Sequence, residues 1–548
     1  MRWIVALAFP LLLPFALPRE AAAETYNVGT WDYERILKQA EPGDTVILGE
    51  GDYPGLPEIR LNGRPDAWIV IKGADGQEQP RILAQEDRNT VEIRGSSYVA
   101  IENLTIDGRD RGGVFAISAS AIPSHHIRIE NCRIVGHGYD QSTVAISTKV
   151  PCWNWVLRRN TIVAAGTGAY LGNSDGMDPF IGGLIEYNLF LDSRGYNMQI
   201  KHQVPRDPTV KGLPTTPQKT IIRHNVFLKG ELDNDSGERP NLLVGALPTR
   251  GPGSEDGYEI YGNLFYHNHR ESLLQAEGRV SIHDNVFVDC TGDGVHLQNH
   301  YGKVQCAYVY DNTFYGVDVA VRFVHPATDD HLVAGNLMFA NTAITGPCAN
   351  QSGNLHAPFA SAKHFVRNPS FDLGKMDFYP LPGKCRGDPL DLSRFVLDTD
   401  SGRDFNGTNK GDGSYRGAYA GEGTNPGWQL DAVIKGELSA AANDHAPPDG
   451  SIRIGDGKGT AQGLVVDLGI RAGDAVAGMG EGARMRFSND GRTWSEPEPF
   501  AAERRGWDLA AFGGSAEPGL KVVFARVSDA AGNWSRVLVD AVEVVPAK

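Results

Sequence analysis

Alternating apolar and polar residues form short runs along most of the chain, and many of these runs share one frame. In this frame two or three strand-forming residues precede an Asn, and alternating apolar residues follow it. Consecutive copies lie 22 to 38 residues apart, a spacing centred on the length of one coil of a solenoid. Nine copies are present, with their asparagines at Asn103, Asn131, Asn160, Asn188, Asn225, Asn263, Asn285, Asn312 and Asn336.

This repeat predicts an all-β protein built on a right-handed parallel β-helix, in which each coil contributes short strands to parallel sheets. No single coil could bury its apolar face alone, so the coils must stack. An Asn at the same corner of every coil tolerates the left-handed turn conformation, and stacked Asn side chains can hydrogen-bond along the column. We therefore interpret the nine asparagines as structural residues.

The N-terminus, residues 1–23, has the pattern of a signal peptide. Arg2 precedes an apolar run from Ile4 to Leu17, and the small residues Ala21 to Ala23 form a cleavage site. The run is too short to span a membrane, and no later apolar run reaches that length. We expect a secreted or periplasmic protein without a membrane span, whose β-helix with its N-terminal cap occupies residues 24–421.

The segment after the signal peptide predicts the cap of the solenoid. Residues 31–40 place Ile36 and Leu37 on one helical face, and EPGDTVILGEGDY then supplies a turn and a first strand. This phrase resembles the N-terminal cap of the pectate-lyase-like superfamily, in particular of its chondroitinase B and alginate lyase branch. The resemblance implies a parallel β-helix and an enzyme that cleaves an acidic, uronate-containing polysaccharide by β-elimination.

The C-terminal part changes character. Asp398, Asp400 and Asp404 predict an acidic surface turn rather than a cation site, and residues 422–446 read as a linker. Residues 447–548 alternate between apolar and polar positions. The phrases MRFSNDGRTWSEPEPF and VFARVSDAAGNWS resemble the immunoglobulin-like modules appended to bacterial exported enzymes and surface proteins, so we expect a small Ig-like β-sandwich there.

The net charge of −15 over 548 residues argues against nucleic acid as a partner and leaves room for a locally basic cleft. We expect a monomer that binds an acidic polysaccharide. The chain has six cysteines, and Cys132 with Cys152 and Cys290 with Cys306 are close enough in sequence to form disulfides. The alternative is six thiols buried as small apolar residues.

Side-chain alternation indicates which residues point out of the solenoid. Met198 and Ile200 should face inward, so Gln199 and Lys201 should face outward, and His202 inward again. Long loops follow Lys201, Lys229 and Leu247, and we expect them to form the walls of a groove. The same parity predicts one outward polar column that binds substrate, containing Lys149, Gln199, Gln275, Gln298 and Arg322 together with Lys201 and His296.

β-Elimination requires neutralisation of the uronate carboxylate, a base for the adjacent proton and an acid for the leaving oxygen. A desolvated lysine can be such a base, and Lys201 is our first candidate, with His296 the next. The resemblance implies a Lys on one coil and an Arg on the next in the base and acid roles, which Lys201 and Arg239 would fill. It also makes Ca²⁺ a possible cofactor.

Three other functions stay open. A glycoside hydrolase on this scaffold needs paired carboxylates, for which Glu277 with Asp175 or Asp293 are candidates. A C5-epimerase would share the lyase machinery. A non-catalytic, adhesive polysaccharide-binding protein would use the same column without chemistry. Reaction products separate these functions, because only elimination yields an unsaturated sugar that absorbs ultraviolet light.

Overall fold

The computed structural model describes residues 23–230, 232, 234, 237–395, 398–436, 447–473, 479–480, 482–530 and 532–545. Residues 1–22 of the predicted signal peptide lie outside this set. Within it, no helix is long and apolar enough to cross a membrane.

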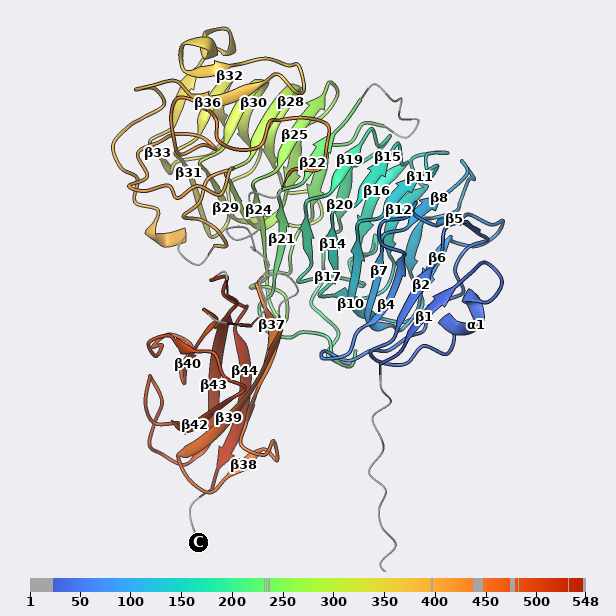
Figure 1. Ribbon diagram of the computed structural model, residues 1–548. Coiled ribbons are helices and arrows are strands. Elements are labelled where there is room, and N and C mark those ends of the chain that lie inside the picture. Colours follow the sequence, from blue (N-terminus) through green and yellow to red (C-terminus); the bar gives the residue numbers. More distant parts are fainter. Residues whose placement is uncertain are drawn as a thin grey trace, which may run out of the picture.

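The chain folds as a parallel β-helix followed by small antiparallel sheets, which confirms the predicted fold class (Figure 1). Fifteen strands form the first sheet of the solenoid, sheet 1, and all pair in parallel. Its strands are β1 (Thr25–Val28), β2 (Thr45–Leu48), β4 (Ile69–Gly73), β7 (Ser97–Glu102), β10 (Ser124–Glu130), β13 (Cys152–Trp153), β14 (Val156–Arg158), β17 (Phe180–Ile181), β18 (Leu184–Glu186), β21 (Lys219–Arg223), β24 (Gly257–Tyr261), β27 (Gly278–His283), β29 (Val304–Tyr310), β31 (Asp330–Ala334) and β33 (Gln351–Ser352).

Sheet 2 contains nineteen strands in two parallel rows, which merge where single long strands serve both. The side row follows the Asn corner and comprises β3 (Asp52–Tyr53), β5 (Arg81–Leu83), β8 (Thr105–Asp107), β11 (Arg133–Val135), β15 (Thr161–Val163), β19 (Leu189–Leu191), β22 (Val226–Leu228) and β25 (Leu264–Asn268). The front row comprises β6 (Val91–Ile93), β9 (Ile117–Ala119), β12 (Val144–Thr148), β16 (Thr167–Leu171), β20 (Met198–Ile200), β23 (Leu242–Val244) and β26 (Leu274–Ala276). Both rows continue into β28 (Val286–Leu297), β30 (Thr313–Phe323), β32 (Leu337–Thr345) and, in the side row, β34 (Leu355–Ala357).

A ladder of buried asparagines joins the coils at one corner. The Nδ2 of each member donates to the Oδ1 of the next at 2.9–3.0 Å. The members are Asn160, Asn188, Asn225, Asn263, Asn285, Asn312, Asn336 and Asn354. Seven of the nine predicted asparagines therefore stack, and Asn354 extends the column.

The other two predicted asparagines occupy the preceding position in their coils. Glu130 pairs with both Glu102 and Arg158, so Asn131 aligns with Asn103 and with Arg159 rather than with Asn160. Asn103 and Asn131 are themselves left-handed (φ +55° and +50°), as is Arg159. The left-handed turn thus belongs to the residue before the ladder. From Asn160 onward the turn and the ladder fall on successive residues, whereas Asn103 and Asn131 do both, since the Asn131 Nδ2 donates to the Asn103 Oδ1 at 3.1 Å.

Inside the solenoid, aromatic side chains stack in register with the coils. Ring centroids lie 4.8–5.1 Å apart along Phe190, Phe227, Phe265, Phe287 and Phe314, so each ring is in van der Waals contact with the next. The spacing equals that of neighbouring strands, which makes the stack a direct result of parallel, in-register pairing. These rings belong to one core that runs through the solenoid.

The N-terminal end of this core is capped by the helix α1 (Tyr33–Leu37), shorter than the predicted segment of residues 31–40. Its Tyr33 and Leu37 side chains are buried and Ile36 packs against the same core. At the other end, the chain turns back through η1 (Phe359–His364), β35 (Val366–Asn368), β36 (Asp377–Pro380) and η2 (Ser393–Phe395). The apolar residues of η1, β35 and β36 cover the outer face of the side row, whereas Phe395 of η2 packs on Tyr310 of sheet 1.

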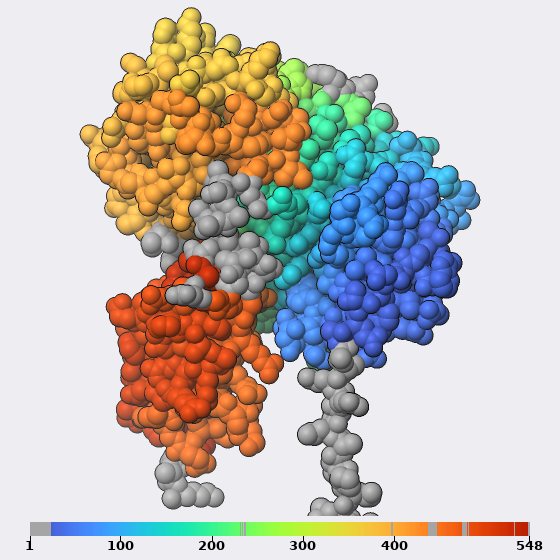
Figure 2. All heavy atoms as spheres, in the orientation of Figure 1, coloured from blue at the N-terminus to red at the C-terminus, as the bar shows by residue number. Residues whose placement is uncertain are grey.

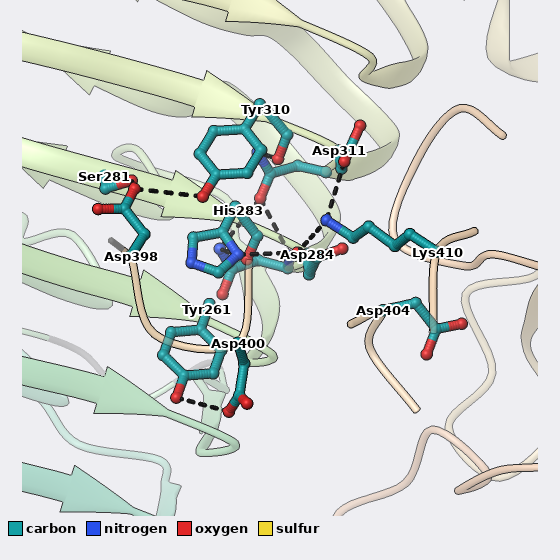
Figure 3. A network of polar contacts seen from close by, with 12 residues as sticks. Tyr261, Ser281, His283, Asp284, Tyr310, Asp311, Asp398, Asp400, Asp404 and Lys410 are labelled. Atoms are coloured by element: carbon teal, nitrogen blue, oxygen red, sulfur yellow. Dashed lines mark hydrogen bonds and ion pairs between the residues drawn. The ribbon is translucent and has the colours of Figure 1, made fainter. Parts of the chain in front are cut away.

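A strap, residues 398–436, continues this return path and docks on sheet 1 through buried polar contacts (Figure 3). The Lys410 ammonium pairs with the buried carboxylates of Asp284 (2.7 Å) and Asp311 (2.8 Å). Tyr261 donates its hydroxyl proton to Asp400 at 3.0 Å, and Tyr310 donates to Asp398 at 3.2 Å. The expectation of an exposed acidic turn is wrong, because these carboxylates face hydroxyl and ammonium groups of the solenoid.

The strap also includes part of the predicted linker. Leu430 packs in the apolar cluster on the side row, and the Lys435 ammonium donates to the carbonyl oxygens of Gly262 (2.9 Å) and Phe405 (2.7 Å). Burial lowers the pKa of Lys435 well below its ordinary value. The strap therefore covers parts of sheet 1 and of the side row.

The C-terminal lobe has its own apolar core between two small sheets, and Figure 2 shows it as a separate lobe in red. An antiparallel sheet of three strands contains β37 (Asp449–Ile454), β39 (Val465–Gly473) and β42 (Glu503–Asp508). The second sheet contains β38 (Thr460–Ala461), β44 (Leu538–Val544), β43 (Gly519–Ser528), β40 (Arg484–Ser488) and β41 (Glu498–Pro499), with β38 parallel to β44. The Ig-like assignment stays a prediction.

All six cysteines are free and buried. Both predicted disulfides are therefore wrong, and the alternative of thiols packed as small apolar side chains is the one observed. Burial raises the pKa of the Cys132 and Cys290 thiols to about 12.

Candidate functional site

A cleft of about 500 Å³ opens over the front row, between loops that rise from neighbouring coils. Its floor comes from β16, β20, β23 and β26, and its walls from residues 238–240 and 298–301. The polar and aromatic residues that line it are Gln141, Tyr170, Tyr196, Gln199, Lys201, His202, Glu238, Arg239, Glu271, Gln275, Glu277, Gln298, His300 and Tyr301.

Strand register places the predicted residues in two outward columns rather than one. Direct partners along the first column are Tyr170, Gln199, Leu243, Gln275, His296 and Arg322. The second column lies two residues further along each coil, and the same registers align Lys149, Gly172, Lys201, Gly245, Glu277 and Gln298. Residues two apart share a face of a strand, so both columns point away from the core.

Lys201 occupies a slot between two glycines. A Cβ on Gly172, which has φ +92°, would meet the Lys201 Cβ at 3.2 Å, and one on Gly245 would meet the Lys201 carbonyl carbon at 2.7 Å. Lys201 is consequently enclosed, with 8% of its surface exposed. Desolvation lowers the pKa of its ammonium, and the Glu277 carboxylate opposes that shift. The slot favours the neutral amine, which is the form that can accept a proton.

Lys149 and Lys201 both lie near the ring of Tyr170. The Lys149 Nζ lies 3.5 Å from the ring centroid and the Lys201 Nζ lies 5.7 Å from it. Desolvation and the charge of Lys201 lower the pKa of Lys149 to about 8. Lys149 lies beside Lys201 and adds positive charge next to the cleft, which favours an acidic ligand.

Tyr301 closes the cleft from above, on a loop that Glu277 holds. The Glu277 Oε2 accepts backbone N–H groups from His300, Tyr301 and Gly302 at 2.9–3.1 Å. The Tyr301 ring stacks on His202 with centroids 4.3 Å apart, and the Lys201 Nζ lies 5.0 Å from the Tyr301 centroid. Tyr301 remains 59% exposed, which leaves its other face open to a ligand.

The prediction that His202 faces the core is wrong. The strand β20 ends at Ile200, so alternation does not extend to His202, and its imidazole lines the cleft. Burial and the neighbouring Lys201 charge lower the pKa of His202. The sequence did not predict that the Tyr301 loop and His202 line the cleft. The one sequence signal for this loop is the aromatic residue in HLQNHYGK, which could form a platform for a sugar.

Arg239 forms the opposite wall. Its guanidinium carbon lies 5.7 Å from the Tyr196 ring centroid. Its backbone carbonyl accepts hydrogen bonds from the Lys229 Nζ (2.8 Å) and the Asn268 Nδ2 (3.0 Å), so the side row fixes the base of this wall. Lys201 and Arg239, predicted on successive coils, therefore line one cleft.

His296 and Arg322 lie further along the first column and are tied to a buried carboxylate. Asp293 accepts from His296 Nδ1 at 2.6 Å and from Arg322 Nε at 2.8 Å. Burial alone would lower the pKa of His296, but the Asp293 carboxylate raises it. The raised pKa favours the protonated imidazole, which cannot accept a proton, so this cluster fits an extension of the basic surface better than the role of base.

Of the three long loops predicted to wall the groove, only the one after Lys229 contributes described residues to the cleft lining. The loop after Lys201 packs through Val210 and Leu213 on Trp153 and Ile181. It is joined to the loop after Leu247 by the buried ion pair of Arg206 with Asp256. This pair turns both loops toward sheet 1, away from Lys201.

Two kinds of cation ligand are present among the described residues. Glu238, Glu271 and Glu277 line the cleft and offer the carboxylate oxygens that Ca²⁺ prefers, although the Oε2 of Glu277 already accepts three hydrogen bonds. The second group, His267, His269 and Asp289, lies at the corner between the two rows.

No protein-family model matches the chain, and no curated protein matches it. Solved structures of similar fold include an alginate lyase from Paenibacillus sp. str. FPU-7, with 14% identity over 61% of this chain and 99% of that chain (TM-score 0.34). A GH136 lacto-N-biosidase from Eubacterium ramulus has 11% identity over 61% of this chain and 68% of that chain (TM-score 0.34). The A-module of the Azotobacter vinelandii mannuronan C-5 epimerase AlgE6 has 16% identity over 59% of this chain and 93% of that chain (TM-score 0.35). At these values the likeness concerns the fold and says nothing about activity.

Proposed function

We propose that this protein is an exported polysaccharide lyase that cleaves a uronate-containing chain by β-elimination in the front-row cleft. The observation that carries the proposal is the enclosed Lys201, whose ammonium pKa is lowered, in one cleft with the Arg239 guanidinium. A base with a lowered pKa and a cation for the substrate carboxylate are two of the three parts that elimination requires, and the third is an acid for the leaving oxygen.

In this mechanism Arg239 and Lys149 pair with the uronate carboxylate, which makes the proton on the adjacent carbon more acidic. The Lys201 amine removes that proton. The electron pair forms the new carbon–carbon double bond, and the glycosidic oxygen leaves the neighbouring carbon. The exposed Tyr301 hydroxyl supplies the proton to that oxygen, while its ring forms a platform for the sugar.

The first experiment incubates the full chain with alginate, pectate, glycosaminoglycans and bacterial exopolysaccharides and follows ultraviolet absorbance. Lys201→Ala should then lower kcat by about 10²- to 10⁴-fold, the usual contribution of a general base, while the circular dichroism spectrum stays unchanged. Lys363→Ala, at an exposed position in η1, is the matched control and should retain full rate. Near-normal turnover of Lys201→Ala would assign the base elsewhere.

A glycoside hydrolase is the second candidate, since Glu238, Glu271 and Glu277 all line the cleft. Hydrolysis would release reducing ends without ultraviolet absorbance. Epimerisation would change the uronate composition without cleavage, and binding without either change would indicate an adhesive protein. Export is part of the proposal, and N-terminal sequencing of the mature protein would test it by locating cleavage after Ala23.

A further inference from the structure

Three potential metal ligands meet at the left-handed corner that follows the side row. His267 and His269 lie at the end of β25 and just beyond it, and Asp289 lies within β28. The two strands pair with Tyr266 opposite Val288 and Asn268 opposite Cys290, so His267 and Asp289 occupy equivalent positions in consecutive coils. Both residues are left-handed, with φ +61° and +64°.

The ligand atoms of these residues converge. One nitrogen from each imidazole and one carboxylate oxygen all lie within 4.8 Å of one another. The His267 Nδ1 is 2.7 Å from one Asp289 oxygen, and the His269 Nε2 is 3.6 Å from the other. The two imidazole centroids are 3.8 Å apart. His267 and His269 line a small cavity, and all three side chains are partly exposed.

We propose that His267, His269 and Asp289 bind a divalent transition metal of the Zn²⁺ class. Zinc takes imidazole nitrogen and carboxylate oxygen at about 2.0–2.2 Å, so ligand atoms around one ion lie roughly 3–4 Å apart. The two distances from Asp289 oxygens to imidazole nitrogens, 2.7 and 3.6 Å, are close to that spacing, and one ligand atom from each of the three residues already lies within 4.8 Å of the others. Each imidazole can form an ion pair with one Asp289 oxygen, but two protonated imidazoles with centroids 3.8 Å apart would repel each other. A metal bound by two neutral imidazoles and the carboxylate removes this repulsion.

The ligand segment also holds the wall of the cleft. Asn268, between the two histidines, donates to the Arg239 carbonyl at 3.0 Å and to the Asn241 side chain at 3.0 Å. A metal that fixes residues 267–269 therefore fixes the backbone from which Arg239 projects. This second step rests on the proposed function, and Asn268 is a positioning residue in it.

The test uses the full chain after treatment with a chelator. Titration with Zn²⁺ in a calorimeter should show one saturable site per chain, and Co²⁺ should give the intense visible absorption of a tetrahedral site. His267→Ala and Asp289→Asn should each weaken Zn²⁺ binding by at least about 100-fold, since each removes one of three ligands. His364→Ala, at an exposed position in η1, is the control and should bind like wild type.

Absence of saturable Zn²⁺ binding by the wild-type chain would overturn the proposal. Unchanged binding by Asp289→Asn would also overturn it. Asp289→Asn preserves side-chain volume, so it keeps the test decisive if His267→Ala fails to fold. These measurements use no polysaccharide. Metal binding without cleavage of any polysaccharide would support the metal site and contradict the lyase function. Cleavage without metal binding would support the lyase function and contradict the metal site.

Discussion

Two lysine ammonium groups share one tyrosine ring in the cleft, and this arrangement predicts how the rate should depend on pH. Lys201 must be neutral to accept a proton, and desolvation lowers its pKa, so kcat/KM should rise with pH through a value below that of an ordinary lysine. Below that pKa the rate should fall about tenfold per pH unit, because the neutral fraction does.

Lys149→Met removes a positive charge close to Lys201. Because like charges disfavour the ammonium form, its removal should raise the pKa of Lys201 and shift the rise of kcat/KM to higher pH by up to about one unit. The measurement is the pH profile of kcat/KM for both proteins. An unchanged profile would mean that another group titrates, and Lys363→Met is the control for loss of a lysine from an exposed position.

At the scale of elements, Lys410 of the strap is the cation that pairs with two buried carboxylates of the solenoid. Lys410→Ala would leave the Asp284 and Asp311 carboxylates without their ammonium partner, at an expected cost of about 3–5 kcal/mol in the free energy of unfolding. Lys375→Ala, which breaks the exposed pair with Asp372, should cost no more than about 1 kcal/mol.

The sign of the pH dependence follows from burial, which raises the pKa of Asp284 and Asp311 above the unfolded-state value. Without Lys410 the folded state readily accommodates these two carboxyl groups only when they are protonated. The free energy of unfolding of the variant should therefore fall as pH rises. Urea denaturation at pH 5 and pH 8 should show the larger deficit at pH 8. An equal deficit at both values would exclude this account.

The cost of replacing an Asn of the ladder, in free energy of unfolding, should depend on its position in the column. Asn263→Ala removes a buried amide that accepts from Asn225 and donates to Ile222, Tyr261 and Asn285, and it should cost about 2–4 kcal/mol in unfolding free energy. Asn354→Ala removes the last member, which has fewer neighbours, and should cost clearly less. Equal losses in chemical denaturation would contradict a cooperative column.

The sequence predicted this fold well because stacked coils repeat the same local pattern, and a repeat is visible without knowing its contacts. It predicted that Gln199 and Lys201 face the cleft, since strand alternation is local. It could not predict His202 or Tyr301, whose positions depend on where β20 ends and on three hydrogen bonds to Glu277. Long-range contacts of this kind also placed Asp398 and Asp400 on sheet 1.

For the whole molecule, Arg536 contributes contacts between the two lobes, beside the pair of His126 with Asp449 at 3.3 Å. Arg536 donates to Asn154 (3.2 Å) and Gln218 (2.9 Å) of the solenoid, and it pairs with Asp449 at 3.2 Å. Arg536→Ala should broaden the distance distribution in small-angle X-ray scattering, because these contacts are lost. Activity on short oligosaccharides should stay within about twofold, since the cleft lies on the front row, and Arg505→Ala is the exposed control.

The six buried thiols have a practical consequence. At pH 8 a thiol with a pKa near 12 is thiolate in only about one molecule in ten thousand, and packing keeps alkylating reagents away from it. The folded chain should resist iodoacetamide and gain six adducts once it opens. Its cysteines are therefore intrinsic reporters of unfolding, spread from Cys132 to Cys385, and mass spectrometry can read in what order the coils come apart.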